Sequence, residues 1–119
     1  MKTPRREEPA PVVGKAYDLN LWILQKIEKF PRSHRHEVGD RLASNALDLL
    51  LNLVEAAYAV EKAELVKRAG ARTNAVRYLL RMSKDLHLMS VDSYGFAAER
   101  LDEIGRMIGG WQKSVVSKT

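Results

Sequence analysis

The chain has 119 residues, of which 20 are lysine or arginine and 15 are aspartate or glutamate, so its formal charge is +5. It contains no cysteine, which excludes a disulfide scaffold, a thiolate metal site and a cysteine nucleophile. The length suits one domain, the 45% hydrophobic content suits a packed core, and no apolar run approaches the ~20 residues that span a bilayer.

Residues 1–13 hold three of the four prolines among charged residues and show no helical periodicity. We therefore expect a flexible tail over residues 1–13 and a folded domain over residues 14–119. The tail lacks the apolar segment of a secretory signal, so we expect a cytoplasmic location.

The first predicted helix covers residues 16–30, where apolar residues recur every three or four positions, and Pro31 ends it. A second helix is expected from a cap at Ser33 to about Val60. Two adjacent apolar stripes run along this helix: Leu42, Ala46, Leu49, Leu53, Ala56 and Val60, and beside them Ala43, Leu47, Leu50, Val54 and Ala57. One stripe is expected to face a bundle core, and another subunit is a candidate partner for the other.

A third helix is predicted over residues 62–87, in which Gly70 marks a bend or an interruption. Its expected core stripe is Leu65, Ala69, Arg72, Val76, Leu79, Ser83 and Leu86. Ser90 is expected to cap a fourth helix with the stripe Tyr94, Ala97, Leu101, Ile104, Ile108, Trp111 and Val115. Four helices with short connections and no alternating strand pattern predict an all-α, antiparallel up-down four-helix bundle.

Motifs for metal binding and catalysis are scarce. No Glu-x-x-His pair is present, which excludes a di-iron bundle, and there is no glycine-rich phosphate loop. His34 and His36 have no further metal ligands nearby, so we expect neither a metal site nor a cofactor.

One enzymatic signal remains, because Arg81 and His87 form an Arg-x5-His pair that resembles the motif of the all-α HEPN ribonucleases. On a regular helix the two side chains point roughly 120° apart, so joint action requires the helix to end before His87. The alternative is that His87 packs at a helix end.

The positive charge is concentrated in residues 62–87, which carry seven basic and two acidic side chains. At ~100° per residue, one edge of this helix holds a set that we call the basic ridge: Lys67, Arg77, Arg81 and Lys84. We expect the ridge to have no acidic partners on its own helix, whereas a solvated face, the alternative interpretation, usually mixes both signs.

The ridge predicts nucleic-acid contacts, and we include Arg68 and Arg72 of the same helix among the candidates. Arg72 falls inside the apolar stripe, so it either snorkels to a bundle end, pairs with an acid of another helix or subunit, or reaches a ligand.

Several blocks of the chain resemble the accessory variability determinant (Avd) proteins of diversity-generating retroelements. The clearest are Lys29-Phe30-Pro31-Arg32-Ser33, Gly39-Asp40-Arg41-Leu42 and Leu101-Asp102-Glu103-Ile104-Gly105-Arg106, and the similarity covers about residues 15–112. A broader relative is the four-helix-bundle family encoded in intervening sequences of bacterial ribosomal RNA genes.

This resemblance implies a non-enzymatic protein that forms a homopentameric ring of four-helix protomers. It implies binding to the retroelement's reverse transcriptase and to template RNA, and possible binding to DNA, in support of mutagenic retrohoming. Arg32 and Arg41 stand in the matched blocks and become candidate contacts to the reverse transcriptase or nucleic acid, with structural ion pairs as the alternative. An HEPN-like ribonuclease and a purely structural oligomer of the intervening-sequence type are the competing functions.

Overall fold

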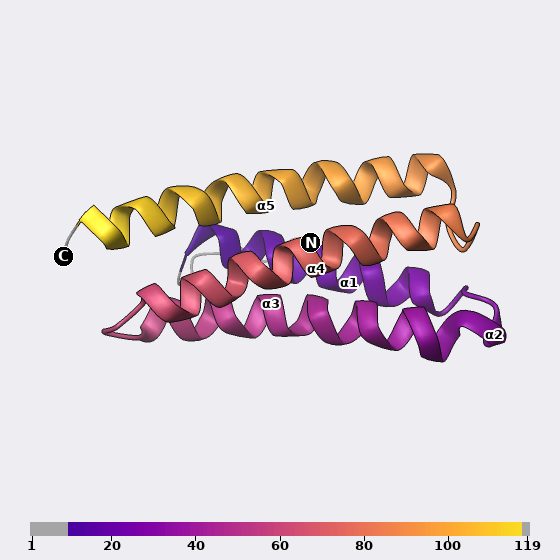
Figure 1. Ribbon diagram of the computed structural model, residues 1–119, viewed down its shortest axis with the longest axis horizontal. Helices are drawn as coiled ribbons and strands as arrows, with labels where there is room; N and C mark the ends of the chain where they lie inside the picture. Colours follow the sequence, from indigo (N-terminus) through magenta and orange to yellow (C-terminus); the bar gives the residue numbers. More distant parts are fainter. Residues whose placement is uncertain (1–9, 118–119) are drawn as a thin grey trace, which may run out of the picture.

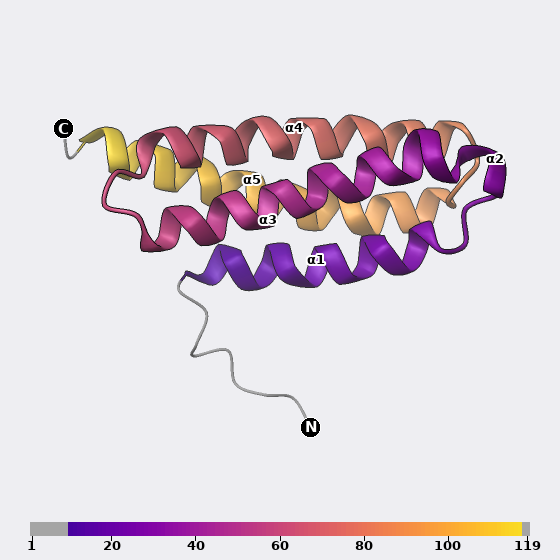
Figure 2. The ribbon, with the colours of Figure 1, turned by 90° about the horizontal axis from the view of Figure 1, so that it is seen from below.

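The computed structural model describes residues 10–117 of the chain. Its main elements are four long antiparallel helices, α1 (Pro11–Ile27), α3 (Asp40–Tyr58), α4 (Ala63–Asp85) and α5 (Val91–Ser117), which lie side by side along the long axis of the molecule (Figure 1). Both α1 and α4 pack against α3 and α5, so α1 and α4 occupy opposite corners of the bundle (Figure 2). The described residues contain no strand, and the predicted all-α four-helix bundle is confirmed.

Helix α1 begins at Pro11, so the predicted tail boundary at residue 13 is wrong. Proline suits the first helical position, where its missing N–H has no partner in the helix. Val12 and Val13 are buried in the core, which gives residues 11–13 a packing reason to join the helix. Residues 1–9, the rest of the predicted tail, lie outside the described residues.

The connection from α1 to α3 is built around the buried ring of Phe30, which is 2% exposed. Helix α1 ends at Ile27, and the Arg35 guanidinium donates to the carbonyl oxygens of Glu28 (3.0 Å) and Phe30 (3.3 Å). These bonds satisfy carbonyl groups that have no partner beyond the end of the helix. Arg35 therefore stabilises the connection that begins at Phe30 and Pro31.

A short helix, α2 (Arg32–His34), and a π-helical turn, η1 (Arg35–Gly39), lead directly into α3. The prediction that Ser33 caps this segment is wrong, because Pro31 holds the cap position and no side chain forms a capping hydrogen bond. Gly39 is buried at the end of the turn, and a Cβ there would lie 3.0 Å from the Ile27 Cγ2 atom. This spacing leaves little room for any other residue.

The buried core follows the predicted stripes closely in α3 and α5. Helix α3 buries Leu42, Ala46, Leu49, Leu53 and Ala56, and α5 buries Ala97, Leu101, Ile104 and Ile108. Val60 is 95% exposed, because α3 ends at Tyr58, two residues before its predicted end. Ser90 caps α5 as predicted, since its Oγ accepts a hydrogen bond from the Ser93 amide (3.0 Å).

Helix α4 confirms the predicted core residues Ala69, Val76 and Ser83, but it buries Val66, Thr73 and Leu80 in place of their predicted neighbours Leu65, Arg72 and Leu79. Thr73 and Ser83 tolerate burial because their hydroxyls donate to backbone carbonyls four residues earlier, at 2.9 and 2.8 Å. The predicted core residue Leu86 lies just beyond the helix and is 43% exposed. Helix α4 also runs unbroken through Gly70, so the predicted interruption is wrong. A Cβ at this position would be in ordinary contact with Ile108 Cγ2 of α5, at 3.9 Å.

An aromatic contact joins α1 to α5. The rings of Trp22 and Phe96 stack with centroids 5.3 Å apart, and the Arg100 guanidinium lies 3.6 Å from the Phe96 centroid. Nearby, Lys15 Nζ lies 3.3 Å from Glu103 Oε2. Among residues 10–117, no helix combines the length and apolar character needed to cross a membrane.

Candidate nucleic-acid interface

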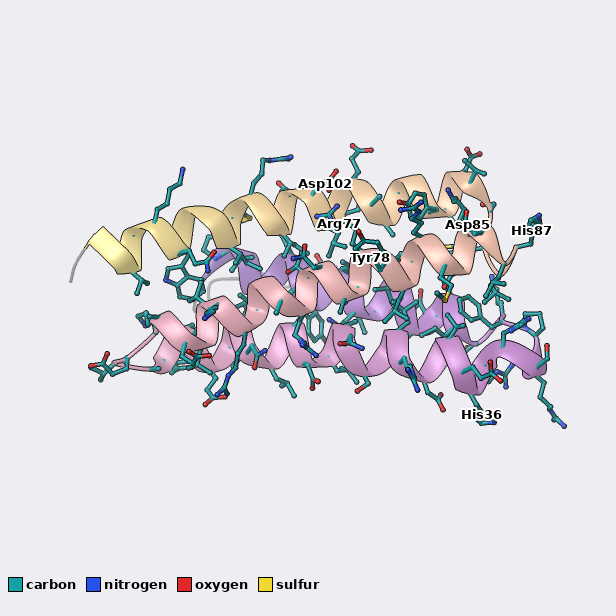
Figure 3. The ribbon with its side chains drawn as sticks, in the orientation of Figure 1. His36, Arg77, Tyr78, Asp85, His87 and Asp102 are labelled. Atoms are coloured by element: carbon teal, nitrogen blue, oxygen red, sulfur yellow. The ribbon has the colours of Figure 1, made fainter. Side chains whose placement is uncertain are left out.

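Helix α4 carries the charge of the candidate site, because its 23 residues include six basic and two acidic side chains. Three members of the basic ridge, Arg77, Arg81 and Lys84, fall on the side of α4 that faces α5, with Lys67 nearer the start of the helix. Figure 3 shows Arg77 and Asp102 pointing toward one another from α4 and α5. The structure therefore keeps the ridge together along one side of the bundle.

The prediction that the ridge lacks acidic partners on its own helix is wrong. Arg81 Nε lies 4.0 Å from Asp85 Oδ2, four residues further along α4, and Lys84 Nζ lies 3.3 Å from Asp85 Oδ1. Lys84 also lies 4.8 Å above the Tyr94 ring of α5. Lys67 forms no ion pair with any described residue.

Arg77 is paired across the helix boundary with Asp102 of α5. The two side chains are 38% and 50% exposed, and exposed ion pairs contribute only about 0–1 kcal/mol. The pair therefore orients the Arg77 guanidinium. Breaking it costs little free energy, so Arg77 can also bind another anion.

Arg68 and Arg72 lie on the opposite side of α4, toward α3, so the predicted six-residue set is divided by the helix. Arg68 Nε lies 3.6 Å from Glu64 Oε2, and Arg72 Nη1 donates to Asn45 Oδ1 of α3 at 3.0 Å. Both arginines border a shallow pocket with Asp48. Of the alternatives for Arg72, a partner on another helix is the observed one, although that partner is an amide instead of an acid.

Arg32 and Arg41 lie where α2 leads into α3, at one end of the bundle (Figure 1). Both are exposed, and neither forms an ion pair within residues 10–117. The alternative that Arg32 and Arg41 form structural ion pairs is therefore not supported within the described part of the chain.

A groove of about 400 Å³, absent from the sequence-based prediction, lies between α4 and α5 beside the ridge. Arg77 and Asp102 border it, and Arg106 adds an exposed cation from α5. Gly105 lies beside the paired arginine, and a Cβ there would be in ordinary contact with Arg77 Nη2, at 3.7 Å. Arg106 follows Asp102 by four residues, so the two lie on one face of α5. This spacing is the sequence feature from which Arg106 could have been predicted as a candidate contact. We call the ridge together with Arg106 the α4–α5 face.

His87 has a structural role at the end of α4. Its φ of 63° lies in the left-handed region, its amide donates to the Lys84 carbonyl (2.9 Å), and the Leu88 amide donates to the Ser83 carbonyl (2.8 Å). This is the Schellman arrangement that closes many helices. The helix thus ends before His87, which is the condition for joint action of His87 with Arg81 (Figure 3). The His87 ring instead contacts its own helix end, because its Nδ1 atom lies 3.1 Å from the carbonyl oxygen of Asp85.

Replacing His87 with glycine is expected to raise the free energy of unfolding by about 0.5–1 kcal/mol, because glycine adopts a positive φ without the steric cost of a Cβ. Urea denaturation followed by circular dichroism measures the change. His87→Ala is the matched control, since it removes the ring but keeps the Cβ. A glycine variant that is less stable than the alanine variant would contradict the capping role.

Comparison with known families gives a match over nearly all of the described chain. A family model described as bAvd-like matches residues 12–115, a span that includes the basic ridge, Arg32, Arg41 and the α4–α5 groove. A search of curated proteins found no match to the chain.

Proposed function

The chain belongs to the bAvd-like family, and from this membership we propose that it is a non-catalytic accessory protein of a diversity-generating retroelement. In this proposal it binds the retroelement's reverse transcriptase together with template RNA or the complementary DNA, and so supports mutagenic retrohoming. The family match over residues 12–115 is the observation that carries the proposal.

The α4–α5 face supports the nucleic-acid part of the proposal. Lys67 and Arg81 present exposed cations without strong partners, and Arg106 adds a third from the neighbouring helix. Side chains of this kind contact phosphates, which gives affinity without reading sequence. Affinity that depends on such contacts falls steeply as salt rises, because binding releases counterions from the nucleic acid.

Neutralising the acid that holds Arg77 is expected to strengthen RNA binding. Asp102→Asn removes the partner of the guanidinium and raises the net charge of the α4–α5 face by one, so we expect roughly several-fold tighter binding at low salt. Fluorescence anisotropy with a labelled RNA measures the affinity. Glu99→Gln removes an exposed acid elsewhere on α5 and serves as the control. An equal gain in RNA affinity in both variants would show that net charge, and not the release of Arg77 from Asp102, causes the effect.

A second surface supports self-assembly, because apolar side chains remain exposed where α1 meets α3. The Asn20 side chain donates to the Ala46 carbonyl of α3 (2.8 Å), which fixes the register of the two helices. The two helices carry exposed apolar side chains, three on α1 and two on α3, which we call the apolar face: Tyr17, Leu21, Leu24, Leu47 and Leu51.

We propose that the apolar face packs against neighbouring protomers in a homopentameric ring. Its residues are 38–59% exposed, and clustered apolar surface of this kind marks interfaces between proteins. The face lies on the α1–α3 side of the bundle, across from the α4–α5 side. A ring assembled through it therefore leaves the basic ridge open to nucleic acid.

Co-purification tests the partner directly. A tagged copy of the chain is expressed with the reverse transcriptase of its retroelement, and the purification is performed with and without ribonuclease. We expect the reverse transcriptase to be retained in both cases, since the proposal includes direct contact between the proteins. Loss of the enzyme in both cases would contradict the proposal, and loss only after ribonuclease would replace direct contact with an RNA bridge.

A further inference from the structure

We propose that Tyr78 is a stacking platform for an unpaired nucleobase and that it makes the α4–α5 face prefer single-stranded over double-stranded nucleic acid. This inference rests on the proposed function, because it takes nucleic acid as the ligand of the basic helix. It adds the form of that ligand and a residue that recognises it.

Tyr78 differs from the other tyrosines of the chain in its surroundings. Its side chain is 66% exposed, and it forms no hydrogen bond or ring contact with any described residue. Tyr94 is covered by Lys84, Tyr17 belongs to the apolar face, and Tyr58 lies at the end of α3. Tyr78 is thus the exposed aromatic ring of the basic helix (Figure 3).

The helix leaves room for a flat ligand beside the Tyr78 ring. Side chains on a helix lean toward its N-terminus, so the ring extends over the turn that contains Asn74 and Ala75. These two side chains are short, and Ala71 one turn earlier is also small and exposed. Met82, 50% exposed, flanks the other side with a polarizable thioether that favours aromatic neighbours.

A cation lies one turn along α4 from Tyr78. Arg81 follows Tyr78 by three residues, a rise of about 4.5 Å, and is therefore its neighbour on the helix surface, whereas the guanidinium of Arg77 is paired with Asp102 of α5. Stacking on an aromatic side chain requires an exposed base face, which a duplex does not offer in its interior. The combination of an open ring and a neighbouring arginine therefore favours a single strand.

The test compares the full-length chain with its Tyr78→Ala variant on two labelled RNAs of equal length, an unstructured single strand and a perfect duplex. We expect the variant to bind the single strand on the order of 5- to 150-fold more weakly, the range found for loss of one stacked base. The duplex affinity is expected to change less than about twofold, because phosphate contacts remain. Tyr78→Phe keeps the ring and should bind the single strand like the parent chain.

Tyr58→Ala is the matched control, since it removes a tyrosine that is 74% exposed outside the basic helix. Equal weakening of single-strand and duplex binding by Tyr78→Ala, or no weakening of either, would overturn the inference. Loss of reverse-transcriptase capture with unchanged RNA affinity would also overturn it and would make the Tyr78–Met82 surface a protein contact. These outcomes leave RNA binding by the parent chain intact, whereas absence of binding by the parent chain would contradict the proposed function itself.

Discussion

The double substitution Lys67→Glu with Arg81→Glu is expected to weaken RNA binding by about 10- to 100-fold at ~0.1 M salt and to reduce the salt dependence by about two counterions. Each change removes a cation and places a carboxylate in its position. These two positions are chosen because Lys67 has no ion pair with a described residue and Arg81 has only a 4.0 Å contact with Asp85. Anisotropy titrations over a range of salt concentrations measure both quantities.

The same choice protects the fold. Arg77 and Lys84 contact α5 through Asp102 and Tyr94, so reversing their charge would also disturb helix packing. The control is Lys26→Glu with Lys29→Glu, which changes the net charge equally at positions of α1 and of the segment after it, outside the candidate set. If both double variants lost affinity to the same extent, net charge alone would explain binding and the ridge would have no special role.

The double substitution Leu21→Glu with Leu51→Glu is expected to convert the proposed ring into monomers. Both side chains belong to the apolar face, and burial of a leucine contributes about 1.5–3 kcal/mol that a carboxylate would forfeit at every interface. The monomer is expected to stay folded, because the two leucines are already 46% and 59% exposed within the bundle. Light scattering during gel filtration should give a mass near 13.5 kDa for the variant.

Val60→Glu with Val91→Glu is the control for self-assembly. These valines are 95% and 72% exposed, Val60 between α3 and α4 and Val91 at the first residue of α5, and neither belongs to the apolar face, so their replacement should leave the assembly intact. A Leu21 and Leu51 variant that kept the mass of the parent chain would exclude the apolar face as the protomer contact.

The bundle is predictable from sequence where one face of a helix is strongly apolar. Helices α3 and α5 bury the predicted stripes, because their core positions hold leucine, isoleucine and alanine almost without exception. In helix α4 the predicted core residues Ala69, Val76 and Ser83 are buried, but Thr73 takes the place predicted for Arg72. The Thr73 hydroxyl bonds to the Ala69 carbonyl of the previous turn, an arrangement that hydropathy does not indicate.

The candidate site was predictable as a charged edge, but its partners were not. The Arg77–Asp102 pair joins residues 25 positions apart and the Arg72–Asn45 bond joins residues 27 apart, so both depend on how the helices pack. The Arg81–Asp85 contact lies within one helix turn and was visible in the sequence. The expectation that the ridge has no acidic partner on its own helix failed because of Asp85 alone.

The structure also accounts for the block Leu101-Asp102-Glu103-Ile104-Gly105-Arg106. Leu101 and Ile104 fill the core, Asp102 pairs with Arg77, and Gly105 lies next to that arginine. One short segment thus combines packing with the organisation of the α4–α5 face.

Synthesis of complementary DNA in a reconstituted reaction is the most direct test of the central claim, that the chain is an accessory protein of a retroelement reverse transcriptase. The reaction contains the enzyme and its template RNA, with no addition, with the parent chain, or with the Lys67→Glu and Arg81→Glu variant. The account predicts template-directed complementary DNA with the parent chain and little or none in the other two reactions. Equal synthesis in all three reactions would contradict it.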